Sequence, residues 1–521
     1  MRAKRWWMLG VTCLSVIVVN LDVTILNIAL PTISAALHAG TSDLQWLVDA
    51  YLLVLAGVML PAGMIADRLG RKRLLLAGLA VFLFASLWCA LSASAGELIA
   101  ARALMGLGAG IVFPLSLAVV SAAFGDDERP AAIGILTAAI ALALPLGPVL
   151  GGLLLQHFSW RSVFWINVPA VCVTLAAGAV LMPESRNPAA PPLDVLGALA
   201  SAAAVTCLVW GVINGQEHGW TAVSTWLPLT GAVVLLAAFL IRERRSANPV
   251  LDPALFRDRR FTWGTAATIA VSVALYGILF VAPQYLQSVL GDDPVSAALR
   301  LLPMMGGLLA GGGAAGPLAR AVGAKLTVAA GLLTLAVGLI VFSEIHLATS
   351  YALVAVGLAL CGVGIGVSIG AAMNAVMAAA GGDEAGIGAS VNSTLRQVAG
   401  AIAVAVLGSV LAGTYARDLR SGLAAVPAGD ALPAGVSASA RSSIAEAVQI
   451  ASRLPSGGPA LRAAAGTAFV HGMSAVMLIC AAIVGVAALT SLRYLPGRNA
   501  AGGPASPPAP AATASDAGRR R

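Results

Sequence analysis

The chain has 521 residues, of which 59% are hydrophobic and 10% are charged, and its mean hydropathy is +0.91. A soluble domain carries about a quarter of its residues as charged side chains, so this composition excludes an ordinary soluble protein. The formal net charge is +8. Because the basic residues lie mainly between apolar stretches, they indicate orientation in a membrane, and we expect no binding of nucleic acid.

Apolar stretches of about 20 residues recur along the chain, and a helix of that length spans the roughly 30 Å hydrocarbon core of a bilayer. The pattern predicts an all-α polytopic membrane protein with fourteen transmembrane helices. The first stretch is too long for the core of a signal peptide, so we expect it to remain as a helix. The predicted spans are 7–30, 44–66, 74–94, 97–122, 131–155, 162–182, 194–214, 224–241, 262–284, 296–319, 324–343, 350–377, 392–414 and 466–489.

Lys and Arg in short loops favour the cytoplasmic side of a membrane. If the spans alternate from a cytoplasmic N-terminus, most basic residues fall on that side, whereas the short outer loops carry only Arg161 and Arg300. We therefore expect a plasma-membrane protein with both termini in the cytoplasm. The cytoplasmic set includes Arg2, Lys4, Arg5, Arg68, Arg71, Lys72, Arg73, Arg242, Arg244, Arg245, Arg320, Lys325 and Arg396.

Two segments lack the composition of a transmembrane helix. Residues 415–465 are punctuated by Pro and Gly and predict a long outer loop. Within it, Ile444, Val448 and Ala451 mark an amphipathic stretch that we expect on the membrane surface. Residues 491–521 are rich in Pro, Ala and Gly and predict a disordered cytoplasmic tail.

Two pairs of segments indicate an internal duplication. "GMIADRLGRK" at 63–72 matches "GPLARAVGAK" at 316–325, and "ALMGLGAGIV" at 103–112 matches "ALCGVGIGVS" at 359–368. Parallel repeats are the plan of transporters that rock around a site between two halves. The expected organisation is a six-helix half over 1–183, two extra helices over 184–261 and a second six-helix half over 262–490.

Several motifs resemble those of a known family. "GMIADRLGRKR" (63–73) resembles the helix 2–3 loop signature of the major facilitator superfamily. Segments similar to its fourteen-helix drug:proton antiporter branch are "LDVTILNIALPTI" (21–33), "LGPVLGG" (146–152), "WRSVFWINVP" (160–169), "LDPALFRDRRF" (251–261) and "NSTLRQVAGA" (392–401). The resemblance covers residues 6 to 490 apart from the outer loop, and it implies the major facilitator fold and multidrug efflux.

The charged 63–73 loop predicts a cytoplasmic latch. Gly63 and Gly70 permit close helix approach and a sharp turn. The carboxylate of Asp67 suits a helix N-terminus and can pair with Arg71 or with a basic group of the other half. Together with Arg68, these groups would hold the two halves together on the cytoplasmic side while the path opens outward.

An alternative for the same loop is lipid binding. The three consecutive basic residues at 71–73 can anchor to anionic headgroups without any latch. The second-half copy of the motif has Arg320 where the first half has an acid. Any latch is therefore asymmetric.

The segment "ALPLGPVLGG" is predicted to seal one end of the transport path. Pro148 removes a helical hydrogen bond, while Gly147, Gly151 and Gly152 form a surface without side chains. Such a helix can bend and pack closely against the opposite half, and in the resembled family the pattern goes with exporters. Ala143 stands where the pattern has its first Gly, and ordinary close packing is the alternative.

Three ionisable residues inside predicted spans are candidates for proton coupling, because charge inside a bilayer is costly. Asp22 lies about 12 Å from the outer end of its helix and Arg102 about 8 Å from the outer end of its own. Asp49 lies at a similar depth, so the three are expected to meet. Structural pairing of Asp22 with Arg102, without titration, is the alternative.

These features predict a monomeric antiporter that exports amphipathic small molecules in exchange for protons, within membrane lipid. No GxxxxGK[ST] motif occurs, so the proton gradient is the expected driving force and no cofactor is expected. Rival functions are a lipid translocase, an exporter of one endogenous metabolite, or a non-transporting membrane receptor or enzyme. Polar residues that would line the cavity are Gln284, Gln287, Asn374 and Gln397.

Overall fold

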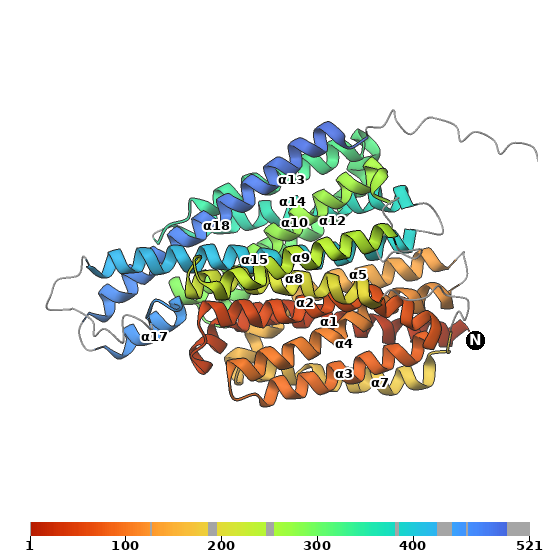
Figure 1. The fold of residues 1–521 in the computed structure, drawn as a ribbon, viewed down its shortest axis with the longest axis horizontal. Coiled ribbons are helices and arrows are strands. Elements are labelled where there is room, and N and C mark those ends of the chain that lie inside the picture. The colour runs from red at the N-terminus through yellow and green to blue at the C-terminus, as the bar shows by residue number, and fades with distance from the viewer. Residues whose placement is uncertain are drawn as a thin grey trace, which may run out of the picture.

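The computed structural model describes residues 2–124, 128–185, 195–245, 255–347, 349–380, 385–424, 440–454 and 457–496. Within these ranges every regular element is a helix (Figure 1). The helices are α1 (Arg2–Leu37), α2 (Thr41–Leu69), α3 (Arg71–Leu91), α4 (Ala95–Ala123), α5 (Arg129–His157), α6 (Ser162–Trp165), α7 (Asn167–Leu181), α8 (Val195–His218), α9 (Val223–Arg245), η1 (Leu255–Arg257), α10 (Arg259–Gln284), η2 (Tyr285–Val289), α11 (Pro294–Arg300), α12 (Leu302–Val322), α13 (Ala324–Ser343), α14 (Tyr351–Ala380), α15 (Ala385–Ala424), α17 (Ile444–Arg453) and α18 (Gly458–Tyr494).

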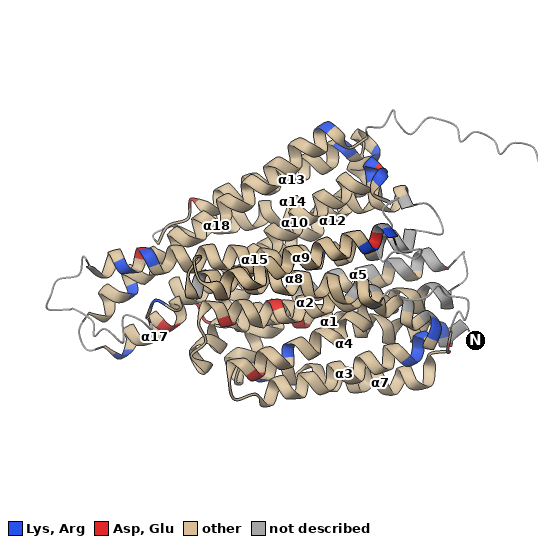
Figure 2. Ribbon diagram, viewed as in Figure 1, with Lys and Arg blue, Asp and Glu red and all other residues tan. Residues whose placement is uncertain are grey.

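Each of the fourteen predicted spans coincides with a helix of this bundle. Twelve helical segments among the described residues are long and apolar enough to cross a membrane, and α5 and α8 cover the other two predicted spans. Two of the predicted spans each correspond to two helices: 162–182 to α6 and α7, and 296–319 to α11 and α12. Most of the charged residues lie toward the ends of the helices (Figure 2). The chain is therefore a multi-pass membrane protein.

The internal repeat is visible in how glycines pack. At six glycines of α4 and α14, an added Cβ atom would collide with a neighbouring helix. The colliding pairs are Gly106 with Tyr51, Gly110 with Leu55 and Gly108 with Phe82 in the first half, and Gly362 with Met304, Gly366 with Leu308 and Gly364 with Leu335 in the second. Every pair has its counterpart in the other half, as a duplication predicts.

The turns that follow α2 and α12 are equivalent as well. Gly70 ends α2 with φ +114° and Gly323 ends α12 with φ +91°, a backbone region that favours glycine over every other residue. Both residues also begin the next helix directly, so each turn is a single residue long. The sharp turn predicted at Gly70 is confirmed.

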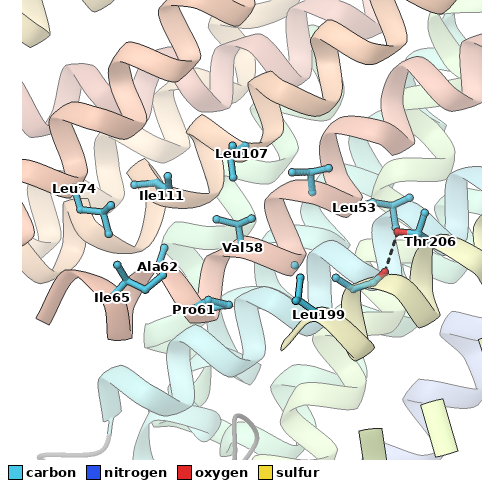
Figure 3. A pocket seen from close by; sticks show the side chains of 13 residues that line it. Leu53, Val58, Pro61, Ala62, Ile65, Leu74, Leu107, Ile111, Leu199 and Thr206 are labelled. Carbon is cyan, nitrogen blue, oxygen red and sulfur yellow. Dashed lines mark hydrogen bonds between the residues drawn. The ribbon is translucent and has the colours of Figure 1, made fainter. Parts of the chain in front are cut away.

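Helix α8 packs on α2 of the first half and on α15 of the second, and α9 packs on α8 (Figure 1). Gly57 of α2 is close to Ala202 of α8, since an added Cβ would come within 2.8 Å of the Ala202 side chain. On α15, Ser409 Oγ donates to the carbonyl of Val212 in α8 at 3.5 Å. Between α2, α3, α4 and α8 is a pocket of about 400 Å³ with almost entirely apolar walls (Figure 3).

The segment predicted as a long outer loop is largely helical where it is described. α15 continues to Ala424 and α18 begins at Gly458, so the boundaries 415 and 465 were wrong. The amphipathic stretch forms α17, but Ile444 and Ala451 are buried. Its cap residue Ser443 also contacts Ser34 of α1 at 3.2 Å between the hydroxyls. The apolar face of α17 thus packs on protein, and the predicted position on the membrane surface was wrong.

Helix α18 ends at Tyr494, inside the predicted tail 491–521. Residues 497–521 lie outside the described part of the chain.

Candidate functional site

The centre of the first half is a buried ion pair. Arg102 Nη1 of α4 donates to Asp22 Oδ2 of α1, and these residues are 1% and 0% exposed. Asn167 Nδ2 of α7 donates to the second carboxylate oxygen of Asp22 at 3.3 Å. Both oxygens of this carboxylate are therefore satisfied, and the predicted meeting of Asp22 with Arg102 is confirmed.

Neighbouring helices hold the pair in place. Arg102 Nε donates to the carbonyl of Leu47 in α2 at 3.2 Å, and its guanidinium lies 4.2 Å from the ring centroid of Tyr51. Asn167 also donates to Ser86 Oγ of α3 at 3.2 Å. Tyr51, Ser86 and Asn167 were not predicted from the sequence. Asn167 lies within the quoted "WRSVFWINVP" motif. As a polar residue in an apolar span, it could have been recognised from the sequence as a candidate functional residue.

Asp49 of α2 does not join this pair. Its side chain is fully buried, and neither carboxylate oxygen has a hydrogen-bond partner among the residues that the structure describes. The prediction that it meets Asp22 and Arg102 was wrong, because equal depth in the membrane does not place residues on facing sides of their helices. Asp49 instead lies one turn after Gln45, on the same face of α2.

That face of α2 contacts the second half. Gln45 Nε2 donates to the carbonyl of Ala405 in α15 at 2.9 Å. Another contact between the halves is the hydrogen bond from Gln287 Nε2 of η2 to the carbonyl of Ile28 in α1, at 2.8 Å. Both lie toward the end of the bundle that the charge pattern predicts to be outer.

The glycine motif of α5 divides its contacts between the two halves. An added Cβ at Gly147 would collide with Thr24 of α1, and one at Gly151 would come within 2.7 Å of Ile25. At Gly152 it would come within 2.7 Å of the Pro294 carbonyl oxygen of α11. Of these three glycines, Gly152 alone therefore has described close contacts with the opposite half. The prediction that Gly147 and Gly151 pack closely against the opposite half was wrong.

The start of α11 is fixed where it meets Gly152. Asp293 Oδ1 accepts hydrogen bonds from the backbone N–H groups of Val295 and Ser296 at 2.9 and 3.0 Å. Hydrogen bonds from the Ser296 backbone and hydroxyl lower the pKa of Asp293 below its usual range. Pro148 is buried within α5, which is helical on both sides of it.

The 63–73 loop is tied to helices of its own half. Arg71 Nη1 donates to the Ala118 carbonyl of α4 at 3.4 Å, and Lys72 Nζ donates to the Ala179 carbonyl of α7 at 2.6 Å. Glu184 accepts a hydrogen bond from the Lys72 backbone N–H at 3.1 Å and pairs with Arg73 at 3.6 Å. The carboxylate that caps the start of α3 is thus Glu184, which the sequence analysis missed.

The other predicted latch residues lie near the end of α2. At Gly63 an added Cβ would meet no described atom within 4 Å, so the close helix approach expected there is not found among the described residues. Arg68 is exposed. Asp67 belongs to α2, but its side chain lies outside the described part of the structure.

The four predicted cavity residues do not come together as one group. Gln284 is buried and donates to the Phe280 carbonyl of its own helix at 2.7 Å. Gln287 bridges to α1, as described above, and Asn374 is exposed on α14. Gln397 of α15 contacts α10. Among the described residues, the hydrogen bonds of Gln284, Gln287 and Gln397 go to other residues and not to one another.

A bundle of long apolar helices with an ion pair buried at its centre defines a polytopic membrane protein. No group of His, Cys, Asp and Glu suited to a metal ion occurs among the described residues. The family model of the Major Facilitator Superfamily matches residues 12–404, and the chain belongs to this superfamily. The family predicted from the sequence is confirmed.

Relatives include drug-resistance proteins. The chain is 40% identical over 359 residues to the multidrug resistance protein Stp of Mycobacterium tuberculosis, covering 68% of this chain and 66% of that protein. It is 33% identical over 366 residues to the tetracenomycin C resistance and export protein of Streptomyces glaucescens, covering 70% and 68%. The chain therefore matches about two thirds of the length of these relatives.

A solved structure shows the same fold. A bacterial homolog to the human lysosomal transporter Spinster superposes with a TM-score of 0.64, covering 95% of this chain and 98% of that one. Its sequence identity of 17% supports similarity of fold alone.

Proposed function

We propose that this protein is a proton-coupled antiporter that exports amphipathic small molecules across the cytoplasmic membrane by alternating access. Its membership of the superfamily and the names of its resistance relatives support drug export. The repeated glycine packing supports two equivalent halves, which suits rocking about a site between them. The halves in this proposal are residues 1–183 and 262–490, with 184–261 as an extra helical pair.

In the proposed orientation both termini are cytoplasmic, because the short loops on that side carry most of the Lys and Arg. The end that holds the Gln45 and Gln287 contacts is then the outer end. With that end closed, the protein would release its cargo outward only after α2 separates from α15 and α5 from α11.

In this proposal, Asp49 is the residue that binds the coupled proton. An ionised carboxylate without a hydrogen-bond donor is expensive in a low-dielectric interior, by several kcal/mol. We infer that Asp49 is uncharged while α2 and α15 lie together. Separation of these helices would bring water to Asp49, so that it could take up a proton from the outer side before the helices close again. Proton binding would thereby be linked to the opening of the outer side.

The Asp22–Arg102 pair has a supporting role in this account. Both carboxylate oxygens of Asp22 already accept hydrogen bonds, so the ionised form is well satisfied. Arg102 contacts α2 at Leu47 and Tyr51, two residues on either side of Asp49. The pair would therefore fix the part of α2 that carries the proton.

The latch assigned to Gly63, Asp67, Arg68, Gly70 and Arg71 belongs to the opposite phase of the cycle. Its contacts to the second half would form when the cytoplasmic ends come together. Each proton that enters would supply about 2.3 kcal/mol per 100 mV of membrane potential, so no nucleotide or other cofactor is needed.

Reconstituted protein tests the proposal. Liposomes with an imposed pH gradient should take up or release ethidium, N-phenyl-1-naphthylamine or 1-anilinonaphthalene-8-sulfonate faster with protein than without it. Asp49→Asn should abolish the dependence on the gradient and keep exchange of the same probe. Glu344→Gln, an exposed carboxyl at the end of α13, is the matched control and should behave as wild type.

The rival functions give different results. Movement of labelled phospholipid without movement of any of the three probes would indicate a lipid translocase. If the rate of probe movement in wild-type vesicles did not depend on the pH gradient, proton coupling would be contradicted.

A further inference from the structure

Helices α10 and α15 of the second half hold a row of polar side chains at one-turn spacing. Asn392 Nδ2 of α15 donates to the hydroxyls of Thr265 and Thr268 in α10, at 3.2 and 2.9 Å. One turn further along both helices, Arg396 Nε donates to Ser272 Oγ at 3.1 Å. Ser272 lies about 20 Å along α10 from its first residue, which is far inside the membrane-spanning part.

An aromatic side chain occupies the next turn of this row. The Tyr276 hydroxyl of α10 donates to Gln397 Oε1 of α15 at 2.7 Å. Its ring fills space left by Gly400, where an added Cβ would come within 2.5 Å of the ring. The two helices that carry the row also pack on the first half, α10 on α1 and α15 on α2. The row therefore reaches the boundary between the two halves, where a transported molecule has to pass.

Arg396 is a cation whose hydrogen-bonding capacity is largely unfilled. A guanidinium has five N–H groups, and the structure gives this one a single hydrogen bond, from Nε. None of the described carboxylates pairs with it. Its side chain is only partly buried. One turn before it on α15, Asn392 Oδ1 is buried and has no hydrogen-bond partner in the described part of the chain.

We propose that Arg396 binds an acidic group, such as a sulfonate or carboxylate, on aromatic amphiphiles that the protein transports. The planar guanidinium can hold two oxygens of such a group at once, which a point charge cannot do. The ring of Tyr276, one turn away, supplies an apolar face for the aromatic part of the same molecule. This inference deepens the proposed export function and rests on it.

A pair of fluorescent probes that differ by one acidic group tests the assignment. 1-Anilinonaphthalene-8-sulfonate is N-phenyl-1-naphthylamine with an added sulfonate. Their fluorescence would be titrated against the full-length protein in phosphatidylcholine nanodiscs, with empty nanodiscs subtracted. Arg396→Gln should weaken sulfonate binding about tenfold or more and leave binding of the neutral probe within about twofold of wild type.

Two further variants separate a binding role from a structural one. Arg396→Lys keeps the positive charge but loses the planar guanidinium that can hold two oxygens at once. It should bind the sulfonate with an affinity between those of wild type and Arg396→Gln. Arg420→Gln removes an exposed Arg near the end of the same helix and should change neither affinity.

Each remaining outcome overturns the assignment in a recognisable way. If Arg396→Gln lost the same factor of binding affinity for both probes, Arg396 would hold α10 and α15 together and would not bind the acidic group. Binding of the neutral probe but not the sulfonate by wild type would refute the inference and leave export standing. Binding of neither probe would contradict export of aromatic amphiphiles, and the inference with it.

Discussion

The two halves of the molecule share a glycine scaffold but treat buried charge differently. In the first half, Arg102 of α4 is paired with Asp22. In the second half, buried Leu358 stands where the 256-residue offset between the matching α4 and α14 segments places the counterpart of Arg102. In the second half, Arg396 of α15 is the corresponding cation, and its one hydrogen-bond partner among the described residues is the hydroxyl of Ser272.

This difference indicates a division of labour between the halves. A buried ion pair with every oxygen satisfied stabilises one arrangement of helices and has little capacity left for a ligand. A cation with unused donors contributes less to stability and can bind an anion that arrives from outside. The comparison therefore predicts that charge removal harms folding in the first half and binding in the second.

The largest effect is expected from breaking the pair in the first half. Asp22→Asn leaves Arg102 buried without a counter-charge, so the free energy of unfolding should fall by about 3–5 kcal/mol. Thermal unfolding in detergent measures this loss. Combining Asp22→Asn with Arg102→Gln should recover part of it, and a double variant as unstable as the single one would contradict the pairing energy assumed here.

A smaller effect is expected where α5 meets α11 across the halves. Gly152→Leu overpacks that contact, at a cost of about 1–3 kcal/mol, and should favour the state with its outer end open. Labelling of Ala405→Cys by an impermeant maleimide, with the six native cysteines replaced, should become faster. Gly147→Leu is the matched control, because it clashes with α1 inside one half and should lower stability without exposing Ala405→Cys.

The smallest effect on stability is expected at Arg396. Its loss removes one hydrogen bond, so Arg396→Gln should lower the free energy of unfolding by about 1 kcal/mol or less. The same unfolding assay on Arg102→Gln should show a loss several times larger. Equal losses of unfolding free energy in Arg102→Gln and Arg396→Gln would contradict the claim that the two halves use their cations differently.

The sequence predicted most of the fold because membrane spans are set by apolar length, and each predicted span coincides with a helix. Depth along a helix could be counted from the sequence, which is why the meeting of Asp22 with Arg102 was predicted correctly. The direction in which a side chain points around its helix could not be counted in the same way. For that reason Asp49 was placed with the pair, although it lies one turn after Gln45, the residue of α2 that contacts α15.

Other features depended on tertiary contacts that no local pattern contains. Arg396 was counted among the cytoplasmic basic residues, but α15 begins at Ala385 and carries it inward to Ser272. Glu184 follows α7 in the chain and caps α3, an association that the fold alone creates. Helix α17 was predicted from its amphipathic pattern, but the pattern does not distinguish a lipid surface from a protein surface.

The most direct test of the account is proton release by the purified protein. Addition of a transported probe to wild-type protein in weakly buffered detergent solution should release protons, which a pH indicator detects. Asp49→Asn should release none while still binding the probe, and Glu344→Gln should release as many as wild type. Undiminished proton release from Asp49→Asn would contradict the claim that Asp49 carries the coupled proton.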